Sequence, residues 1–176
     1  MNTQRNLLTA ASLLFLLSST AHAAVATIQK DTAWSADQEE SAHDFKCPGD
    51  KVLVGRSHDG DENDPTKYLC GTVIQNGTAL KKYNEVKITD ETGMLCFDGK
   101  VLTGRGRSGD EKEPYWIYCA EFRDTWGDKL VHAHTEILEG KESDHQLQCS
   151  TNGVFWGMQH IGDENEDTRY FCAKLF

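Results

Sequence analysis

Hydrophobic and polar residues alternate over short stretches along most of this chain, which is the pattern of half-buried β-strands. No segment shows a long helical period, so the pattern predicts an all-β fold. Turn signals such as Pro-Gly, Asp-Gly and Asn-Gly separate the stretches. The predicted strands are residues 51–57, 67–70, 85–89, 100–105, 116–119, 130–138, 154–160 and 169–172.

One long apolar run interrupts this pattern, at residues 7–17. The run is too short to span a bilayer. Arg5 precedes it, and an Ala-His-Ala cleavage signal follows at residues 21–23. This arrangement is typical of a secretory signal peptide. We expect residues 1–23 to be removed and residues 24–176 to form a single secreted or periplasmic domain with no membrane span.

The cysteines define an internal repeat, because the spacing Cys-x22-Cys occurs three times. The three blocks align without a gap, and each has a Gly eight residues after its first Cys and a Gly-Asp-Glu turn that begins thirteen residues after it. The blocks are residues 47–70, 96–119 and 149–172. We expect these repeats to be arranged with pseudo-threefold symmetry, for which a β-trefoil and a β-prism are both suitable architectures.

If the three repeats fold alike, one disulfide within each block is the favoured pairing. These bridges would be Cys47–Cys70, Cys96–Cys119 and Cys149–Cys172. The alternative joins neighbouring blocks through Cys70–Cys96, Cys119–Cys149 and Cys172–Cys47. A signal peptide implies an oxidising compartment, where disulfides persist, and the chain has no Cys-x2-Cys pair that would favour zinc.

Each block carries an acidic turn, which is the main candidate for a metal site. Calcium prefers several oxygen ligands, and carboxylates two residues apart supply them. The candidate calcium ligands are Asp61, Glu62, Asp64, Asp110, Glu111, Glu113, Asp163, Glu164 and Glu166. A structural interpretation is favoured over calcium, because the Gly can adopt a positive φ angle and the Asp can bond to its own turn. The Glu could then pair with Arg56 or Arg105.

Aromatic and histidine side chains near the acidic turns are the candidates for ligand binding. Tyr115 and Trp116 could stack on a sugar or anchor a protein partner, and core packing is the alternative. His58 and His160 share one repeat position, where they could contact a ligand or respond to pH. A half-exposed structural position on a strand is the alternative for both. The remaining tryptophans are expected in the core or between repeats: Trp34, Trp126 and Trp156.

The first block resembles the cysteine loops of dermatopontin-like secreted proteins. The resemblance rests on Cys-Pro-Gly-Asp-Lys-Val-Leu-Val-Gly-Arg-Ser at residues 47–57 and on Tyr-Leu-Cys at residues 68–70, and it extends over the three Cys-x22-Cys blocks. That family favours Asp-Arg-x-Trp before the second Cys, and residues 167–172 come nearest to this motif. The resemblance implies extracellular adhesion, binding to matrix proteins or glycosaminoglycans, and lectin-like agglutination.

The net charge and the absence of two sequence motifs argue against some classes of function. With 18 Lys and Arg against 28 Asp and Glu, the formal charge of −10 argues against a nucleic-acid partner, which needs excess basic residues. Gly-x-Ser-x-Gly and phosphate-loop motifs are absent. Asn76 begins an Asn-Gly-Thr glycosylation signal, which matters only in a eukaryotic secretory pathway.

Repetition argues against catalysis, because one catalytic dyad would not recur at equal spacing in every block. We expect a secreted, non-catalytic binding or adhesion module that recognises glycan or protein multivalently through the acidic turns. The alternative is an exported subunit that binds a protein partner and whose acidic turns are purely structural, and a hydrolase is least favoured. No cofactor is required, and calcium is the one candidate ion.

Overall fold

The computed structural model describes residues 24–61, 63–90, 93–109, 115–160 and 165–176 and confirms the all-β prediction. Every regular element among these residues is a strand, and none of them forms a helix that could cross a membrane. The strands are β1 (Thr27–Lys30), β2 (Gln38–Glu39), β3 (Ala42–Lys46), β4 (Lys51–Asp59), β5 (Pro65–Gln75), β6 (Thr78–Ala79), β7 (Lys81–Asp90), β8 (Met94–Leu95), β9 (Val101–Ser108), β10 (Tyr115–Arg123), β11 (His132–Lys141), β12 (Asp144–Gln148), β13 (Val154–His160) and β14 (Asp167–Leu175).

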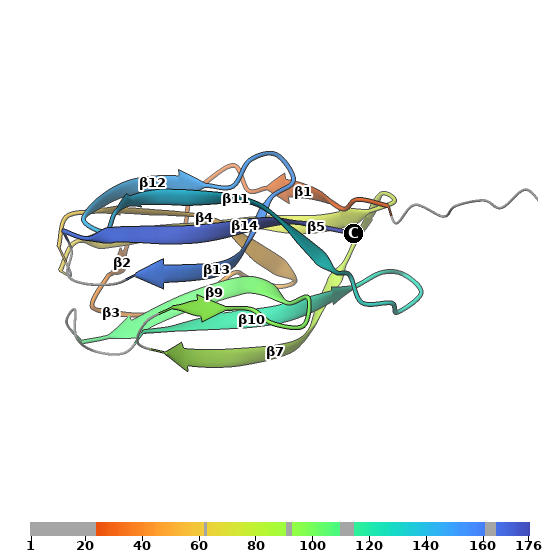
Figure 1. Cartoon of the computed structure of the whole chain (residues 1–176), viewed down its shortest axis with the longest axis horizontal. Coiled ribbons are helices and arrows are strands. Elements are labelled where there is room, and N and C mark those ends of the chain that lie inside the picture. The colour runs from red at the N-terminus through yellow and green to blue at the C-terminus, as the bar shows by residue number, and fades with distance from the viewer. Residues whose placement is uncertain (1–23, 62, 91–92, 110–114, 161–164) are drawn as a thin grey trace, which may run out of the picture.

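The strands form two open sheets, and Figure 1 shows the smaller one below the larger. The larger, ten-stranded sheet has the order β1-β5-β4-β12-β11-β14-β13-β8, with β2 and β6 attached to β5. The smaller, four-stranded sheet has the order β3-β9-β10-β7. Side chains of the two sheets meet between them, so the core lies where the sheets face each other.

Each Cys-x22-Cys block folds into one antiparallel hairpin, which is β4–β5, β9–β10 or β13–β14. A disulfide in each block joins a cysteine four or five residues before the first strand to the second strand. The predicted bridges within blocks are therefore confirmed: Cys47–Cys70, Cys96–Cys119 and Cys149–Cys172. Three disulfides in a chain of this size are typical of extracellular or periplasmic proteins.

The blocks interlock through the short strand that precedes each first cysteine. That strand leaves its own hairpin and pairs with the hairpin of another block: β3 with β9, β8 with β13, and β12 with β4. The pairings run from the first block to the second, from the second to the third, and from the third back to the first. The strands β4, β9 and β13 also pack against one another. Pseudo-threefold symmetry itself stays a prediction.

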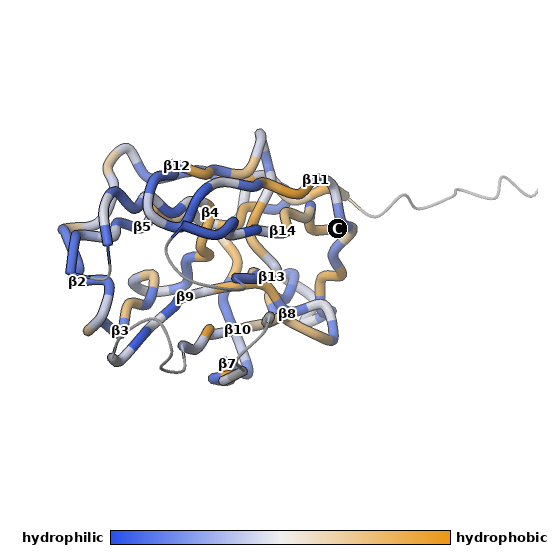
Figure 2. Tube along the Cα trace, turned by 60° about the vertical axis from the view of Figure 1, so that its left-hand side comes forward, coloured by the Kyte–Doolittle hydropathy of each residue, from blue (hydrophilic) through white to orange (hydrophobic). Residues whose placement is uncertain are grey.

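Buried apolar side chains form two clusters. One surrounds the three disulfides and includes Leu53, Phe155 and Met158. The other gathers residues such as Val54, Val73 and Phe122. Figure 2 shows hydrophobic segments along the interior strands, whereas the end near β2 is mostly hydrophilic.

The tryptophans divide between core and surface. Trp34 and Trp156 pack against the second apolar cluster, as expected. The sequence also places Trp126 in the core, and that prediction is wrong, because its side chain is 80% exposed in the loop between β10 and β11. Hydrophobicity alone predicts burial here, but the local turn holds this residue on the outside.

Replacing Cys47 and Cys70 together by serine is expected to lower the free energy of unfolding by about 3.5 kcal/mol, because the bridge restrains the unfolded chain. Urea unfolding of the oxidised protein measures this loss. The matched variant with serine at Cys149 and Cys172 opens a bridge of the same 23-residue separation and should lose a similar amount. Equal stability of the first variant and the unmodified protein would contradict the expectation.

Candidate functional site

The predicted aromatic pair of β10 divides between the two faces of the smaller sheet. Tyr115 points into the core and is buried with the disulfide cluster. Trp116, the next residue, points outward and is half-buried. Tyr118 lies two residues further along β10 and therefore shares the outer face with Trp116. Of the predicted pair, Trp116 alone reaches the surface, and Tyr118 is the neighbour that the sequence analysis missed.

Both outward rings lie across β9, because the opposing residues of that strand are glycines. Trp116 is in register with Gly106 and Tyr118 with Gly104. A Cβ atom on Gly106 would overlap the indole of Trp116. The missing side chain on β9 is therefore what allows the indole to reach the next strand, β3.

A single carboxylate on β3 fixes both rings. Asp44 Oδ1 accepts hydrogen bonds from Trp116 Nε1 at 2.9 Å and from Tyr118 Oη at 2.8 Å. Burial opposes ionisation of Asp44, but these two donors outweigh it and lower the pKa of the carboxyl group. The indole and the phenol are thus held in one orientation before any ligand arrives.

Two lysines cover the outer surfaces of these rings. Lys87 Nζ lies 3.6 Å from the ring centroid of Trp116, and Lys46 Nζ lies 3.8 Å from that of Tyr118. Lys46 Nζ also lies 2.9 Å from Glu85 Oε2. We call this surface the aromatic face, and it consists of Asp44, Lys46, Lys87, Trp116 and Tyr118. Tyr118 is only 7% exposed, so a ligand could stack on the rings only by displacing the lysines that cover them.

A buried ionic cluster lies between the sheets. Arg56 on β4 and Arg105 on β9 are almost completely buried. Arg56 Nη2 lies 2.9 Å from Glu40 Oε2 and 2.7 Å from Glu142 Oε1. Arg105 Nη1 lies 2.6 Å from Glu40 Oε1. Burial opposes ionisation of the carboxyl groups, but the two arginines outweigh it, lowering the pKa of Glu142 to about 2 and that of Glu40 well below its usual value.

Histidine and tyrosine side chains complete the cluster. Arg105 Nη1 donates to Tyr68 Oη at 3.2 Å, and His43 Nε2 lies 2.6 Å from the same hydroxyl. Arg56 Nη1 lies 3.3 Å from His145 Nε2. Burial, followed by the neighbouring arginine, lowers the pKa of His43 and of His145 to about 4. Both imidazoles are therefore neutral at neutral pH.

The sequence does contain a signal for this cluster. Glu-Ser-Ala-His at residues 40–43 and Glu-Ser-Asp-His at residues 142–145 stand at the same distance before the first Cys of the first and third blocks. Arg56 and Arg105 share one position of the first and second blocks, where the third block has Met158. Two similar four-residue segments outside the Cys-x22-Cys blocks are easily overlooked, and each has an ionic partner in another block: Arg105 for Glu40 and Arg56 for Glu142.

At each of the three interfaces between blocks, the incoming segment and the residue that it meets are matched in charge. The segment with Glu40 precedes β3, which pairs with the strand of Arg105. Glu142 precedes β12, which pairs with the strand of Arg56. The remaining pairing joins β8 to β13, and there Met94 stands opposite Met158. Arginine therefore occurs where the incoming strand brings Glu and His, and methionine occurs where it does not.

The predicted ligand residues His58 and His160 belong to the margin of this cluster. His58 is buried, and His160 Nδ1 lies 4.0 Å from Glu142 Oε2. Arg107 occupies the corresponding position of the middle block, and its Nη1 lies 3.8 Å from Glu40 Oε1. Burial, and then nearby arginines, lower the pKa of His58, and burial also lowers that of His160. These groups face the ionic cluster more than solvent.

The described part of the first acidic turn is closed by its own carboxylates. Asp64 Oδ2 accepts a hydrogen bond from the Asp61 amide at 3.0 Å, and Asp61 Oδ1 accepts one from the Asn63 amide at 2.8 Å. Gly60 has φ +119°, and a Cβ there would overlap the Asp64 carboxylate. Glu166 lies beside β14, and its carbonyl accepts the Glu142 amide at 2.9 Å. These features agree with the structural interpretation of the turns.

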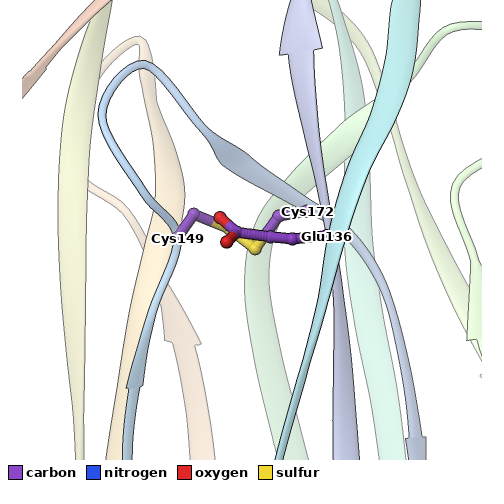
Figure 3. Close-up of side chains that lie close together, drawn as sticks. All are labelled: Glu136, Cys149 and Cys172. Carbon is purple, nitrogen blue, oxygen red and sulfur yellow. A yellow bond between two sulfur atoms is a disulfide. The ribbon is translucent and has the colours of Figure 1, made fainter.

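The other candidate calcium ligands lie outside the described residues: Glu62, Asp110, Glu111, Glu113, Asp163 and Glu164. Among the residues that are described, the one group of three ligand-type side chains close enough to share an ion is Glu136, Cys149 and Cys172, drawn in Figure 3. The two sulfurs form a disulfide, and Glu136 Oε1 accepts the Ser150 amide at 2.7 Å. That group is therefore unsuited to a metal ion in the oxidised protein.

Comparison with models of protein families, with curated proteins and with solved structures finds no match for this chain. The resemblance to dermatopontin-like proteins thus stays a prediction from the cysteine blocks.

Replacing Arg56 by methionine is expected to lower the free energy of unfolding by about 3–5 kcal/mol, because Glu40 and Glu142 would keep their burial and lose a partner. Urea unfolding at neutral pH measures the loss. Lys51→Met is the matched control, since it breaks a bridge to Asp31 that is about one-third exposed and should cost about 1 kcal/mol or less. Similar losses in the two variants would contradict a special role for the buried pair.

Stability is expected to fall as the pH decreases from about 7 towards 4. In the unfolded chain His43 and His145 take up protons near pH 6.5, whereas in the folded protein they do so only near pH 4. The unfolded state therefore binds more protons in this pH range, and acidification stabilises it relative to the folded state. Glu142, with its pKa lowered from 4.5 to about 2, extends the loss below pH 4.5.

Urea unfolding measured across this pH range tests the expectation. A double variant with glutamine at His43 and His145 should show a flatter dependence between pH 7 and 4, whatever its absolute stability. An equally steep dependence in the variant would assign the effect to other groups.

Proposed function

We propose that this protein is a secreted, non-catalytic binding module that recognises glycan chains through the aromatic face. The observation that supports this most directly is the pair of rings, Trp116 and Tyr118, held in a fixed orientation by Asp44 on the outside of the smaller sheet. Sugars present flat C–H surfaces that stack on such rings. Because the two residues are two apart on one strand, their spacing is about 7 Å, and consecutive sugar units of a chain could contact both.

Pre-organisation supports the same proposal. Gly106 and Asp44 already fix the indole, so a ligand would not need to order it on binding. The ligand would displace Lys87 and Lys46 from the rings, which costs about 0.5–1 kcal/mol for each exposed cation–π contact. The freed ammonium groups would then be available to the hydroxyl or acidic groups of the ligand.

The buried carboxylates support the non-catalytic part of the proposal. Glu40 and Glu142 are buried carboxylates that share Arg56, and both have lowered pKa values. A general acid needs a pKa near the working pH and access to substrate. We therefore assign these groups to stability and treat the acidic turns as structural, with no requirement for calcium.

The three repeats form the scaffold that carries the aromatic face. We propose that the three blocks are arranged with pseudo-threefold symmetry, as in a β-prism, because their leading strands pair in a cyclic order. Multivalent recognition through the acidic turns of the three blocks stays a prediction of the sequence.

A glycan array probed with the oxidised protein, residues 24–176, tests the proposal. We expect binding that survives EDTA and that falls more than tenfold in Trp116→Ala, the size expected for a central tryptophan. Tyr83→Ala is the matched control, because Tyr83 is an exposed aromatic residue on β7 that lies outside the aromatic face. Melting temperatures of both variants check that they remain folded.

Two outcomes would overturn this assignment. Binding that requires calcium and is unaffected by Trp116→Ala would move the site to the acidic turns. An array with no binding under either condition would favour a protein partner instead, to be sought by pull-down.

A further inference from the structure

A cleft lies beside the C-terminal residue, Phe176. It has a volume of about 550 Å³ and lies between the turn after β5 and the loop between β10 and β11. Its lining includes Asn76, Asp124, Trp126, Asp128 and Phe176. None of these residues belongs to the aromatic face, so ligand binding in this cleft would be independent of the proposed function.

Trp126 stands in the wall of this cleft with 80% of its side chain exposed. The exposure is not the result of a loose loop. Asp124 Oδ1 accepts the amides of Trp126 at 2.9 Å and of Asp128 at 2.8 Å, and the Asp124 amide donates to the Asp128 carbonyl at 2.9 Å. Gly127, with φ +90°, closes the turn. The turn therefore fixes the backbone of Trp126 on the outside, where its indole is open to water, against the usual tendency to bury it.

The lining of the cleft carries the carboxylates of Asp124 and Asp128 and the ammonium of Lys129, and Ala24 also lines it. Asp124 and Asp128 both line it, and within the described residues the Asp128 carboxylate has no hydrogen bond or ion pair. Lys129 also lines the cleft, but its ammonium lies 3.9 Å from Glu121 Oε2 and is partly neutralised there. Leu130, Val131 and Phe176 make the remaining wall apolar.

We propose that this cleft binds an organic ammonium group. A tryptophan face is the aromatic surface that attracts cations best, and a carboxylate beside it adds to the attraction. The apolar wall suits the methyl or methylene groups that such a cation carries. A neutral ligand would leave the Asp128 carboxylate unpaired, and an anion would be repelled. The group could come from a small quaternary amine or from a lysine side chain of a protein.

Titration of the folded protein, residues 24–176, followed through the indole Nε1–H signal of Trp126 in NMR spectra, tests the proposal. Choline represents the quaternary source and N-acetyl-lysine amide the side-chain source. 3,3-Dimethylbutanol has nearly the shape of choline without its charge. We expect saturable shifts with choline at a Kd of about 1 mM and at least tenfold weaker binding of the neutral alcohol. Tighter binding of the lysine derivative than of choline would assign the site to protein side chains, and the reverse order to small amines.

Two variants separate charge from shape. Asp128→Asn keeps the turn, which uses the backbone of that residue, and is expected to weaken choline binding about tenfold. Asp37→Asn is the matched control, because Asp37 is an exposed carboxylate elsewhere, paired with Lys67, and its loss should leave binding unchanged. If Asp128→Asn does not fold, the salt dependence of the Kd of the unmodified protein replaces it, since charge attraction weakens with ionic strength.

Three results would overturn the proposal. One is the absence of a saturable shift at Trp126 up to about ten times the expected Kd. Another is equal affinity for choline and the neutral alcohol, which would describe an apolar cavity. The last is an affinity for choline that changes neither with Asp128→Asn nor with salt.

Discussion

The burial of charge between the two sheets is the constraint on which this fold depends. Arginine side chains that are removed from water lose a large solvation energy, which is recovered only if carboxylates of good geometry accompany them. Arg56 and Arg105 achieve this by sharing Glu40, while Glu142 supplies the second carboxylate to Arg56. Each of the four residues comes from a different segment of the chain, so the cluster forms only when those segments are all in place.

The same constraint joins the repeats to one another. Each block places its leading strand on a neighbour, and the ion pairs Glu40–Arg105 and Glu142–Arg56 follow that exchange, while Glu40 also pairs with Arg56 of its own repeat. At the third interface Met158, opposite Met94, stands where the other two interfaces have arginine. Two ionic interfaces and one apolar interface make the three junctions different, so a block that paired with the wrong neighbour would leave a buried charge without a partner. Burial of ion pairs thus favours one order of the blocks at some cost in stability.

A scaffold tied in this way leaves its outer surfaces available for binding. The disulfides and the ionic cluster fix β9 and β10 from inside, and the rings of Trp116 and Tyr118 lie on the opposite side of the same strands. Trp126 is held by its own turn at the far end. Rigid elements that position exposed aromatic residues are typical of recognition surfaces, because little conformational entropy is lost on binding.

The sequence by itself predicted the all-β class, the eight longest strands and the favoured disulfide pairing, but it missed β1, β2 and β6. Alternation of period two and the equal Cys-x22-Cys spacing are local or strictly repeated features, so they could be interpreted without a structure, and the pairing within blocks is confirmed. The side-chain environments were decided only by the tertiary structure. Trp126 is exposed because a turn holds it outside, Tyr115 is buried because it alternates with Trp116, and His58 and His160 face charges from other segments. The Glu-Ser-x-His segments were visible, but their partners are set by which strand each block places on its neighbour. That choice depends on contacts between residues far apart in the chain, which no local pattern encodes.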